Sequence, residues 1–302
     1  RDGISWSANN LTLTAARDVR IEALLQATGT SSLTLHVGTA NGADGAVSNA
    51  SVRVGSSTDG TFSGRVDFGG RAGTGLLEVN GQAYTVINAL GAEGSVTGTD
   101  LQGMAGNLAG RYALGNPIDA SATASWAGGF NPVGTDGADF TGTFDGLGNV
   151  ISHLHIDRPD RYGTGLLGVT QEATLRNVGL ANVSITGGQR TGALVGAAMY
   201  GTIQNVYSSG VVGGEYYVGG LIGTQHELNT RYARSWATVS GDRHIGGLAG
   251  FNGSWIEYSY AKGNVTATGA LSGSANSAGG LTGDNTGVLS NSYATGHVVG
   301  AN

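Results

Sequence analysis

The amino-terminal third of the chain is made of short segments in which apolar and polar residues alternate, a pattern typical of β-strands with one buried face. Examples are Leu11-Thr-Leu13, Val19-Arg-Ile21 and Val52-Arg-Val54, each closed within a few residues by Gly, Asn, Asp or Ser. No window long enough for a helix keeps a helical apolar stripe free of glycine. We therefore expect strands of about three to five residues throughout, including the segment 20–26, which comes closest to a helical pattern.

A short block with the pattern Gly-x-Leu-x-Gly or a close variant recurs five times between Thr164 and Gly283. The leucines of the blocks follow one another at a nearly constant spacing: Leu166, Leu194, Leu221, Leu248 and Leu281. A period of about 27 residues predicts stacked repeats, each of which buries its apolar face against its neighbours. We expect these leucines to point inward. The last spacing is longer because of an insertion at 268–277, which we expect to form a protruding loop.

Many short, evenly spaced strands are compatible with a β-sandwich, a propeller or a parallel β-helix. A propeller blade needs four strands and about 40 residues or more, which exceeds the length of these repeats. Three short strands and three turns fit a repeat of the observed length. The sequence thus predicts an all-β parallel β-helix (β-solenoid) with about 20–30 residues per coil. We expect one continuous elongated domain, with irregular coils over 1–104, transition coils with protruding loops over 105–162, and regular repeats over 163–302.

Two kinds of side chain recur at equivalent places in the repeats. Aromatic residues follow the leucine blocks in the second half of each repeat: Tyr207, Trp236, Tyr260 and Tyr293. Asparagines recur at Asn177, Asn205 and Asn291. Because neighbouring coils lie about 4.8 Å apart, the rings should form a ladder, and the asparagines a partial ladder at a corner.

Composition excludes several classes of partner. The net charge is −6, Lys262 is the single lysine, and the arginines are scattered without a cluster. Nucleic-acid binding needs a basic face, so we expect no nucleic-acid partner. No apolar run is long enough to span a membrane, and the first residues lack the apolar stretch of a signal peptide. The absence of cysteine suits an extracellular protein with a long, regular core.

Candidate catalytic and metal-binding side chains gather around residues 136–161. Asp136, Asp139 and Asp145 could supply the two carboxylates of a glycosidase, which lie about 5 to 9.5 Å apart. Asp145 stands in a Phe-Asp-Gly-Leu-Gly turn, where a bond to its own backbone would account for it. His153 and His155 would face the same side of a strand, but no third ligand follows at a defined spacing. We predict no catalytic residue, metal site or cofactor.

Several motifs resemble a known family. Ile118-Asp-Ala-Ser, Gly129-Phe-Asn-Pro-Val-Gly, Phe140-Thr-Gly-Thr-Phe-Asp-Gly-Leu-Gly and the repeated GGLxG and SYATG elements resemble the GLUG-repeat region of bacterial filamentous-haemagglutinin-like exoproteins. These exoproteins are secreted by the two-partner route. The resemblance covers about residues 105–302 and implies a right-handed parallel β-helix, an outer-membrane secretion transporter as partner of the full-length protein, and adhesion. The Asn-Pro-Asn-Leu-type turn of the secretion domain is absent, so we interpret the chain as an internal fragment.

We therefore expect a secreted or cell-surface bacterial adhesin segment, a non-catalytic rod that presents binding surfaces for host cells, other bacteria or glycans. Two alternatives stay open. One is a carbohydrate-active β-helix enzyme, either a polysaccharide lyase or a glycosidase, which would show a cleft with paired acids. The other is capture of a soluble host protein by loops that leave the β-helix, which would show a long ordered loop with exposed aromatic residues.

The third repeat departs most from its neighbours and is the predicted binding site. Tyrosine and arginine anchor interfaces, and aromatic rings stack on sugars. The residues expected to bind are Tyr216, Tyr217, His226, Arg231, Tyr232 and Arg234. The competing interpretation is that Tyr232 and Trp236 belong to an internal aromatic ladder, while the arginines only solvate the surface.

Overall fold

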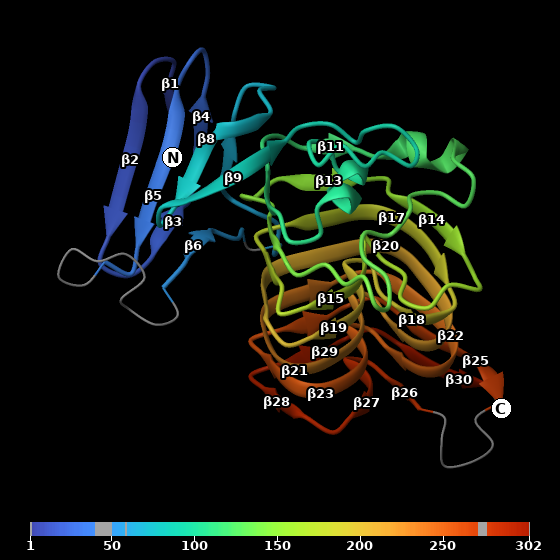
Figure 1. Cartoon of the computed structure of the whole chain (residues 1–302). Coiled ribbons are helices and arrows are strands. Elements are labelled where there is room, and N and C mark those ends of the chain that lie inside the picture. Colours follow the sequence, from blue (N-terminus) through green and yellow to red (C-terminus); the bar gives the residue numbers. More distant parts are fainter. Residues whose placement is uncertain (1, 40–49, 58, 271–276, 302) are drawn as a thin grey trace.

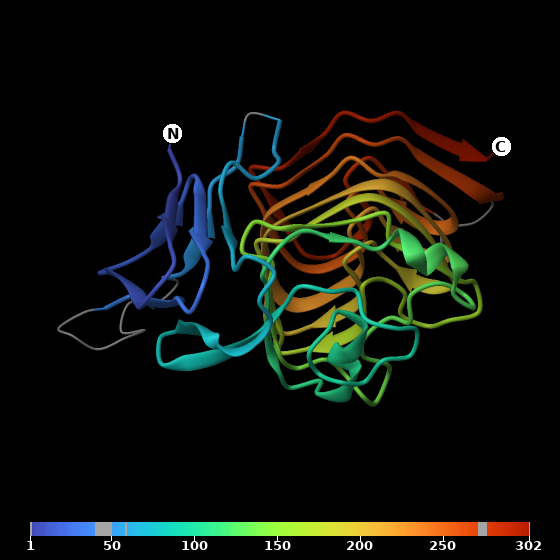
Figure 2. The same ribbon diagram turned by 90° about the horizontal axis from the view of Figure 1, so that it is seen from above.

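The structure, a computed structural model, describes residues 2–39, 50–57, 59–270 and 277–301 (Figure 1). These residues form thirty β-strands and two short 3₁₀ helices, so the expected all-β fold is confirmed. Among the described strands, β8 and β9 pair antiparallel and every other pairing is parallel. The chain forms two stacks of parallel strands that lie side by side (Figures 1 and 2).

The amino-terminal stack contains three small parallel sheets, ordered β1-β4-β7, β3-β6 and β2-β5-β8. Its strands are β1 (Ile4–Trp6), β2 (Asn10–Ala15), β3 (Val19–Ile21), β4 (Leu24–Ala27), β5 (Ser32–Val37), β6 (Val52–Val54), β7 (Arg65–Asp67) and β8 (Gly73–Val79). Inward-facing residues lie in register, for example Leu11 opposite Leu33 and Leu33 opposite Leu77. These side chains belong to a second apolar cluster, which Ala113 and Leu147 of the main stack also join.

A β-hairpin joins the two stacks. Strand β8 pairs antiparallel with β9 (Gln82–Ile87), and β9 then pairs parallel with β10 (Arg111–Leu114) of the main stack. Asn80 and Gly81 form the turn with φ values of 49° and 71°, as a two-residue type I′ turn requires. The hairpin therefore carries hydrogen bonding continuously from β5 to β10.

The main stack begins with less regular coils. Its first elements are η1 (Gln102–Gly106), β10, β11 (Ile118–Asp119), η2 (Ser121–Ser125), β12 (Thr143–Asp145), β13 (Val150–Ser152) and β14 (His155–Arg158). The two 3₁₀ helices and the longer connections lie in this part of the chain (Figure 2). The domain boundaries expected at 104/105 and 162/163 stay predictions.

Regular coils follow from β15 onward. Their strands are β15 (Leu167–Gln171), β16 (Thr174–Arg176), β17 (Gly179–Gly187), β18 (Gln189–Thr191), β19 (Val195–Met199), β20 (Thr202–Gly219), β21 (Ile222–Ser235), β22 (Thr238–Gly246), β23 (Ala249–Glu257), β24 (Tyr260–Ala261), β25 (Val265–Ala270), β26 (Ala278–Gly279), β27 (Thr282–Asn285), β28 (Val288–Ser290), β29 (Tyr293–Ala294) and β30 (Val298–Ala301). Each coil pairs with the next at the repeat spacing, so that Val195 lies opposite Ile222 and Ile222 opposite Ala249.

The repeated leucines pack as predicted. Leu166, Leu194, Leu221 and Leu248 are fully buried, and Leu281, in the last coil, is half-buried against the same core. The glycine that ends each block allows close approach of backbones. A Cβ at Gly250 would overlap the carbonyl carbon of Tyr217, which leaves no room for any side chain.

Strands in the regular coils are longer than the predicted three to five residues: β20 has 18 and β21 has 14. Residues with positive φ, such as Asn205 (52°) and Tyr232 (55°), turn the corners while residues on both sides stay paired with the next coil. The predicted loop at 268–277 falls largely on residues 271–276, which lie outside the described residues.

Candidate functional site

The amino-terminal stack packs against one outer face of the main stack, along a line that we call the seam. At the seam, the side-chain amides of Asn177 and Asn205 bind the backbone of strand β6. Asn177 donates from Nδ2 to the Val52 carbonyl (3.1 Å) and accepts the Val54 amide (3.4 Å), and Asn205 donates to the Val54 carbonyl (2.9 Å). These amides pair with an edge of β6 as a neighbouring strand would.

The predicted asparagine ladder is confirmed for two of its three members. Asn205 donates to Oδ1 of Asn177 (2.9 Å), and both residues turn the corner at φ 52°. Asn291 occupies the same corner three coils further on but binds Ser290 Oγ, because Tyr232 and Tyr258 hold the corner positions in between. The three asparagines share a backbone position, and two of them hold the seam together.

Replacement of both seam asparagines by glycine should release β6. Asn177→Gly/Asn205→Gly keeps the positive φ accessible and removes only the amides. We expect the Val54 amide to exchange with deuterium faster, because it loses its acceptor. Asn291→Gly is the matched control, since it changes the same corner position away from the seam. Unchanged exchange at Val54 in the double variant would show that the amides do not hold β6.

Four charged residues and one glutamine of successive coils line up on the face beside the seam. The column runs Asp145, Arg176, Gln204, Arg231 and Glu257. Asp145 Oδ2 pairs with Arg176 Nε at 2.6 Å, and Arg231 Nε pairs with Glu257 Oε2 at 2.7 Å. Asp145 is fully buried, and its Oδ1 also accepts the Leu147 amide at 2.9 Å, as expected for a turn aspartate. The ion pairs therefore link adjacent coils.

Three of the six predicted binding residues lie at this corner. Arg231 makes the ion pair just described, and Tyr232 stacks on Tyr258 with ring centroids 5.4 Å apart and planes 16° apart. Arg234 donates from Nη1 to the Gly60 carbonyl (3.2 Å) and so binds the amino-terminal stack. Arg234 thus helps to hold the fold together.

The other three predicted residues lie at a different corner. Tyr217 stacks on His244 (4.7 Å, 21°), His226 stacks on Phe251 (4.8 Å, 30°), and the Tyr216 ring contacts those of Tyr217 and His244. Burial lowers the pKa of His226 and of His244, and burial next to Tyr216 raises the pKa of Tyr217 to about 12. These shifts favour uncharged rings. The structure therefore divides the predicted site into two groups.

The aromatic ladder is present and lies next to the seam. Trp236 contacts Tyr207 and Tyr260 edge-on at 5.9 and 5.5 Å, and Tyr260 stacks on Tyr293 at 5.2 Å. Phe62 of the amino-terminal stack continues the ladder by contacting Tyr207 at 5.2 Å. Trp236 thus belongs to the ladder as the competing interpretation held, whereas Tyr232 does not.

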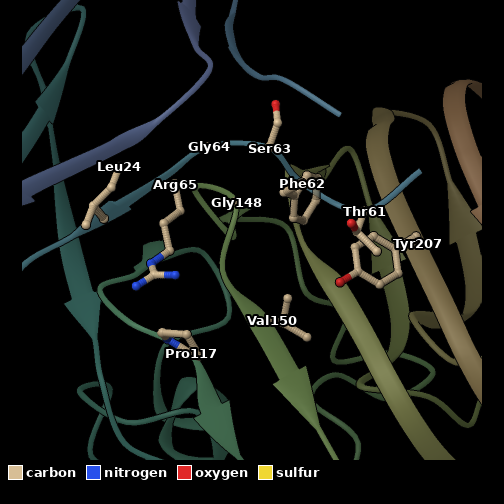
Figure 3. A pocket seen from close by; sticks show the side chains of 10 residues that line it. All are labelled: Leu24, Thr61, Phe62, Ser63, Gly64, Arg65, Pro117, Gly148, Val150 and Tyr207. Carbon is tan, nitrogen blue, oxygen red and sulfur yellow. The ribbon is translucent and has the colours of Figure 1, made fainter. Parts of the chain in front are cut away.

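Three hollows follow the seam. The first, of about 240 Å³, includes Phe62, Arg65 and Tyr207 in its lining (Figure 3). The second, of about 210 Å³, is lined by residues that include Arg53, Arg176 and Arg231, and the third, of about 320 Å³, by residues that include Arg20, Arg53, Tyr232 and Arg234. The arginines of the amino-terminal stack were not among the predicted binding residues, because their neighbours in the hollows lie far away in the chain.

The two histidines of the candidate metal site do not share a strand face. His153 has a φ of 58° and lies between β13 and β14, so the expectation that it shares a strand face with His155 was wrong. Its Nδ1 lies 3.0 Å from Asp119 Oδ1, and this hydrogen bond lowers the pKa of Asp119. Within the described part of the chain, no group of three His, Cys, Asp or Glu side chains could hold a metal ion.

Comparison with known proteins gives one informative likeness. No family model matches the chain. Over 170 residues the chain is 39% identical to halomucin of Haloquadratum walsbyi (strain DSM 16790 / HBSQ001). The matched region amounts to 51% of this chain and 2% of halomucin. The chain is therefore similar to a small part of a very much longer protein.

Proposed function

We propose that this chain is part of an extracellular surface protein and that its coils form a non-catalytic adhesive segment for host cells, other bacteria or glycans. The likeness to part of halomucin supports the extracellular assignment. In the described residues, no helix has the length and apolarity needed to cross a membrane. The resemblance to filamentous-haemagglutinin-like exoproteins is the reason to propose, in addition, secretion of the full-length protein through an outer-membrane transporter.

The stacked pair of Tyr232 and Tyr258 is the observation that carries the adhesive proposal. Both tyrosines have positive φ values, 55° and 50°, in a backbone conformation that is rare and costly for bulky residues. Other coils place asparagine at this corner, which tolerates it better. Tyr258 is nevertheless 50% exposed, so the burial of its ring does not fully offset the conformational cost of the positive φ. Exposed, preorganised rings are suited to stacking on a ligand.

The surroundings of the tyrosine pair suit a carbohydrate or protein surface. Trp255, which shortly precedes Tyr258, is 51% exposed. Glu257 stands between Trp255 and Tyr258 in the chain and pairs with Arg231 of the preceding coil. This ion pair therefore adds hydrogen-bond donors and acceptors beside the rings. Aromatic and arginine side chains dominate binding hot spots. The proposed binding surface therefore contains Arg231 and Tyr232, which the sequence predicted, and in addition Trp255, Glu257 and Tyr258.

Replacement of the two corner tyrosines by asparagine separates binding from folding. Tyr232→Asn/Tyr258→Asn should keep or raise the melting temperature, because asparagine relieves the positive φ. We expect the same variant to bind cells or arrayed glycans at least tenfold more weakly than wild type, because both stacking surfaces are lost. Wild-type binding by the variant would contradict the proposal. A lowered melting temperature together with normal binding would assign the rings to folding alone.

The proposal that the segment is non-catalytic rests on the contacts of the Asp145 carboxylate. Asp145 is committed to Arg176 and to the Leu147 amide, which leaves it no free role as an acid or nucleophile. Incubation of the protein with acidic and neutral polysaccharides tests this directly. We expect no new reducing ends and no unsaturated products, whereas cleavage that a single Asp→Asn change abolishes would favour a lyase or glycosidase.

A further inference from the structure

The first hollow of the seam combines an apolar wall with an arginine whose hydrogen-bonding capacity is largely unused. Its lining includes the half-buried apolar residues Leu24, Phe62 and Val150, with Tyr207 in contact with Phe62. Figure 3 shows the Arg65 guanidinium extending toward Pro117, another lining residue, on the side of the hollow away from the rings of Phe62 and Tyr207. The hollow thus offers apolar surface and a fixed positive charge to the same small ligand.

Arg65 has few partners within the described residues. Its nearest carboxylate is Asp67, whose Oδ2 lies 3.8 Å from Nη2, beyond hydrogen-bonding distance. Its Nε is buried without a hydrogen-bond partner. The side chain is 43% exposed, which leaves the terminal nitrogens open to the hollow. An arginine fork placed in this way can bind a carboxylate through two parallel hydrogen bonds.

The backbone around Arg65 is held in place from both stacks. The Arg65 amide donates to the Ala23 carbonyl (3.3 Å), and the Val66 amide donates to the Leu147 carbonyl (2.9 Å). A Cβ at Gly148 would overlap the Gly64 carbonyl oxygen, so the two stacks approach as closely as their backbones permit. The hollow is therefore preformed, which lowers the entropic cost of binding.

Size and charge narrow the ligand class. A volume of about 240 Å³ lies below the roughly 300–1,000 Å³ typical of drug-sized ligands, so the hollow suits a single ring. One guanidinium matches one negative charge. Two acids hold hydroxyls of the rim: Glu22, which pairs with Arg20 at 3.1 Å, accepts the Ser63 hydroxyl, and Asp59 accepts the amide and the hydroxyl of Thr61 at 2.9 and 2.7 Å. The oxygens of the Thr61 and Ser63 hydroxyls keep lone pairs that can accept hydrogen bonds from sugar hydroxyls.

We propose that this hollow binds one carboxylate-bearing sugar ring, such as a hexuronate of an acidic polysaccharide. The carboxylate pairs with the Nη1 and Nη2 groups of Arg65, and the apolar face of the ring packs against Phe62. The proposal rests on the adhesive function above and names a ligand class for a second surface. It explains why the amino-terminal stack supplies an arginine with so few partners at the junction of the two stacks.

Titration of the protein with methyl β-glucuronide tests the proposal. The methyl ester of this compound and methyl β-glucoside are the uncharged control ligands. We expect the ester and the glucoside to bind at least tenfold more weakly than the acid. Arg65→Gln should weaken binding of the acid by about ten- to a hundredfold, as expected for a charge-assisted bidentate contact. Arg65→Lys, which keeps the charge but not the fork, should give an intermediate loss.

Arg17→Gln is the matched control, because it removes one exposed positive charge from the same stack without touching the hollow. Equal binding of acid and ester, or equal losses in Arg17→Gln and Arg65→Gln, would overturn the proposal. If Arg65→Gln lowers the melting temperature, its weaker binding does not isolate the contact with the carboxylate. The affinity of Arg65→Lys for the acid, compared with that of wild type, then tests this contact. Wild-type protein that adheres to cells or glycan surfaces but does not bind methyl β-glucuronide would refute this site alone, whereas glucuronide binding without adhesion would refute the adhesive function alone.

Discussion

Replacement of Asp145 by asparagine is expected to lower the free energy of unfolding by about 3–5 kcal/mol, the range for breaking a buried ion pair. The change keeps the shape and the Oδ1 acceptor for the Leu147 amide but removes the charge that Arg176 pairs with at 2.6 Å. The side chains of Arg176 and Asp145 are only 14% and 1% exposed, so water cannot replace the lost partner. Chemical denaturation monitored by circular dichroism measures the effect.

Asp157→Asn is the control for this prediction. Asp157 is exposed, and a substitution there should change the free energy of unfolding by less than about 0.5 kcal/mol. Equal stability of the Asp145 and Asp157 variants would show that the Asp145–Arg176 pair contributes nothing to the joining of coils.

Leu221→Ala should cost about 2–5 kcal/mol of unfolding free energy, the range for truncating a buried leucine. Leu221 is fully buried, and its backbone accepts from Leu194 and donates to Leu248, so the cavity would open between coils that cannot move apart independently. The same denaturation experiment measures the change.

Val211→Ala is the control here, because Val211 lies on the neighbouring strand with 54% of its surface exposed. It should have an effect several times smaller than that of Leu221→Ala. A Leu221→Ala protein as stable as wild type would contradict the register of the repeats.

The sequence pattern was most informative where the chain repeats itself. The leucine spacing predicted which residues point inward because each coil repeats the environment of the one before, so a single period determines many contacts. The amino-terminal stack has no such period. Its register with the main stack depends on the Asn80-Gly81 hairpin, a strong local turn signal that the alternating segments on both sides could have revealed.

The binding surfaces were harder to predict. Alternation along a strand shows which residues face outward, but the corner at Tyr232 reverses that alternation, and residues before and after it belong to different faces. Alignment of Tyr232 with Asn177 and Asn205 at the repeat spacing would have placed it at the corner. Arg65 and Tyr207 lie in distant parts of the sequence, and no local pattern indicates that they line one hollow.

Among the corners with positive φ, the one at Asn177, Asn205, Tyr232, Tyr258 and Asn291 gives each of these coils a side chain that can change without disturbing the core. Asn177 and Asn205 use it to hold a strand, whereas Tyr232 and Tyr258 use it to display rings. Because successive corners are about 4.8 Å apart, the column acts as a row of independent contacts in a fixed order. New binding preferences can therefore arise one coil at a time, by single substitutions whose effects on stability and on neighbouring contacts stay local.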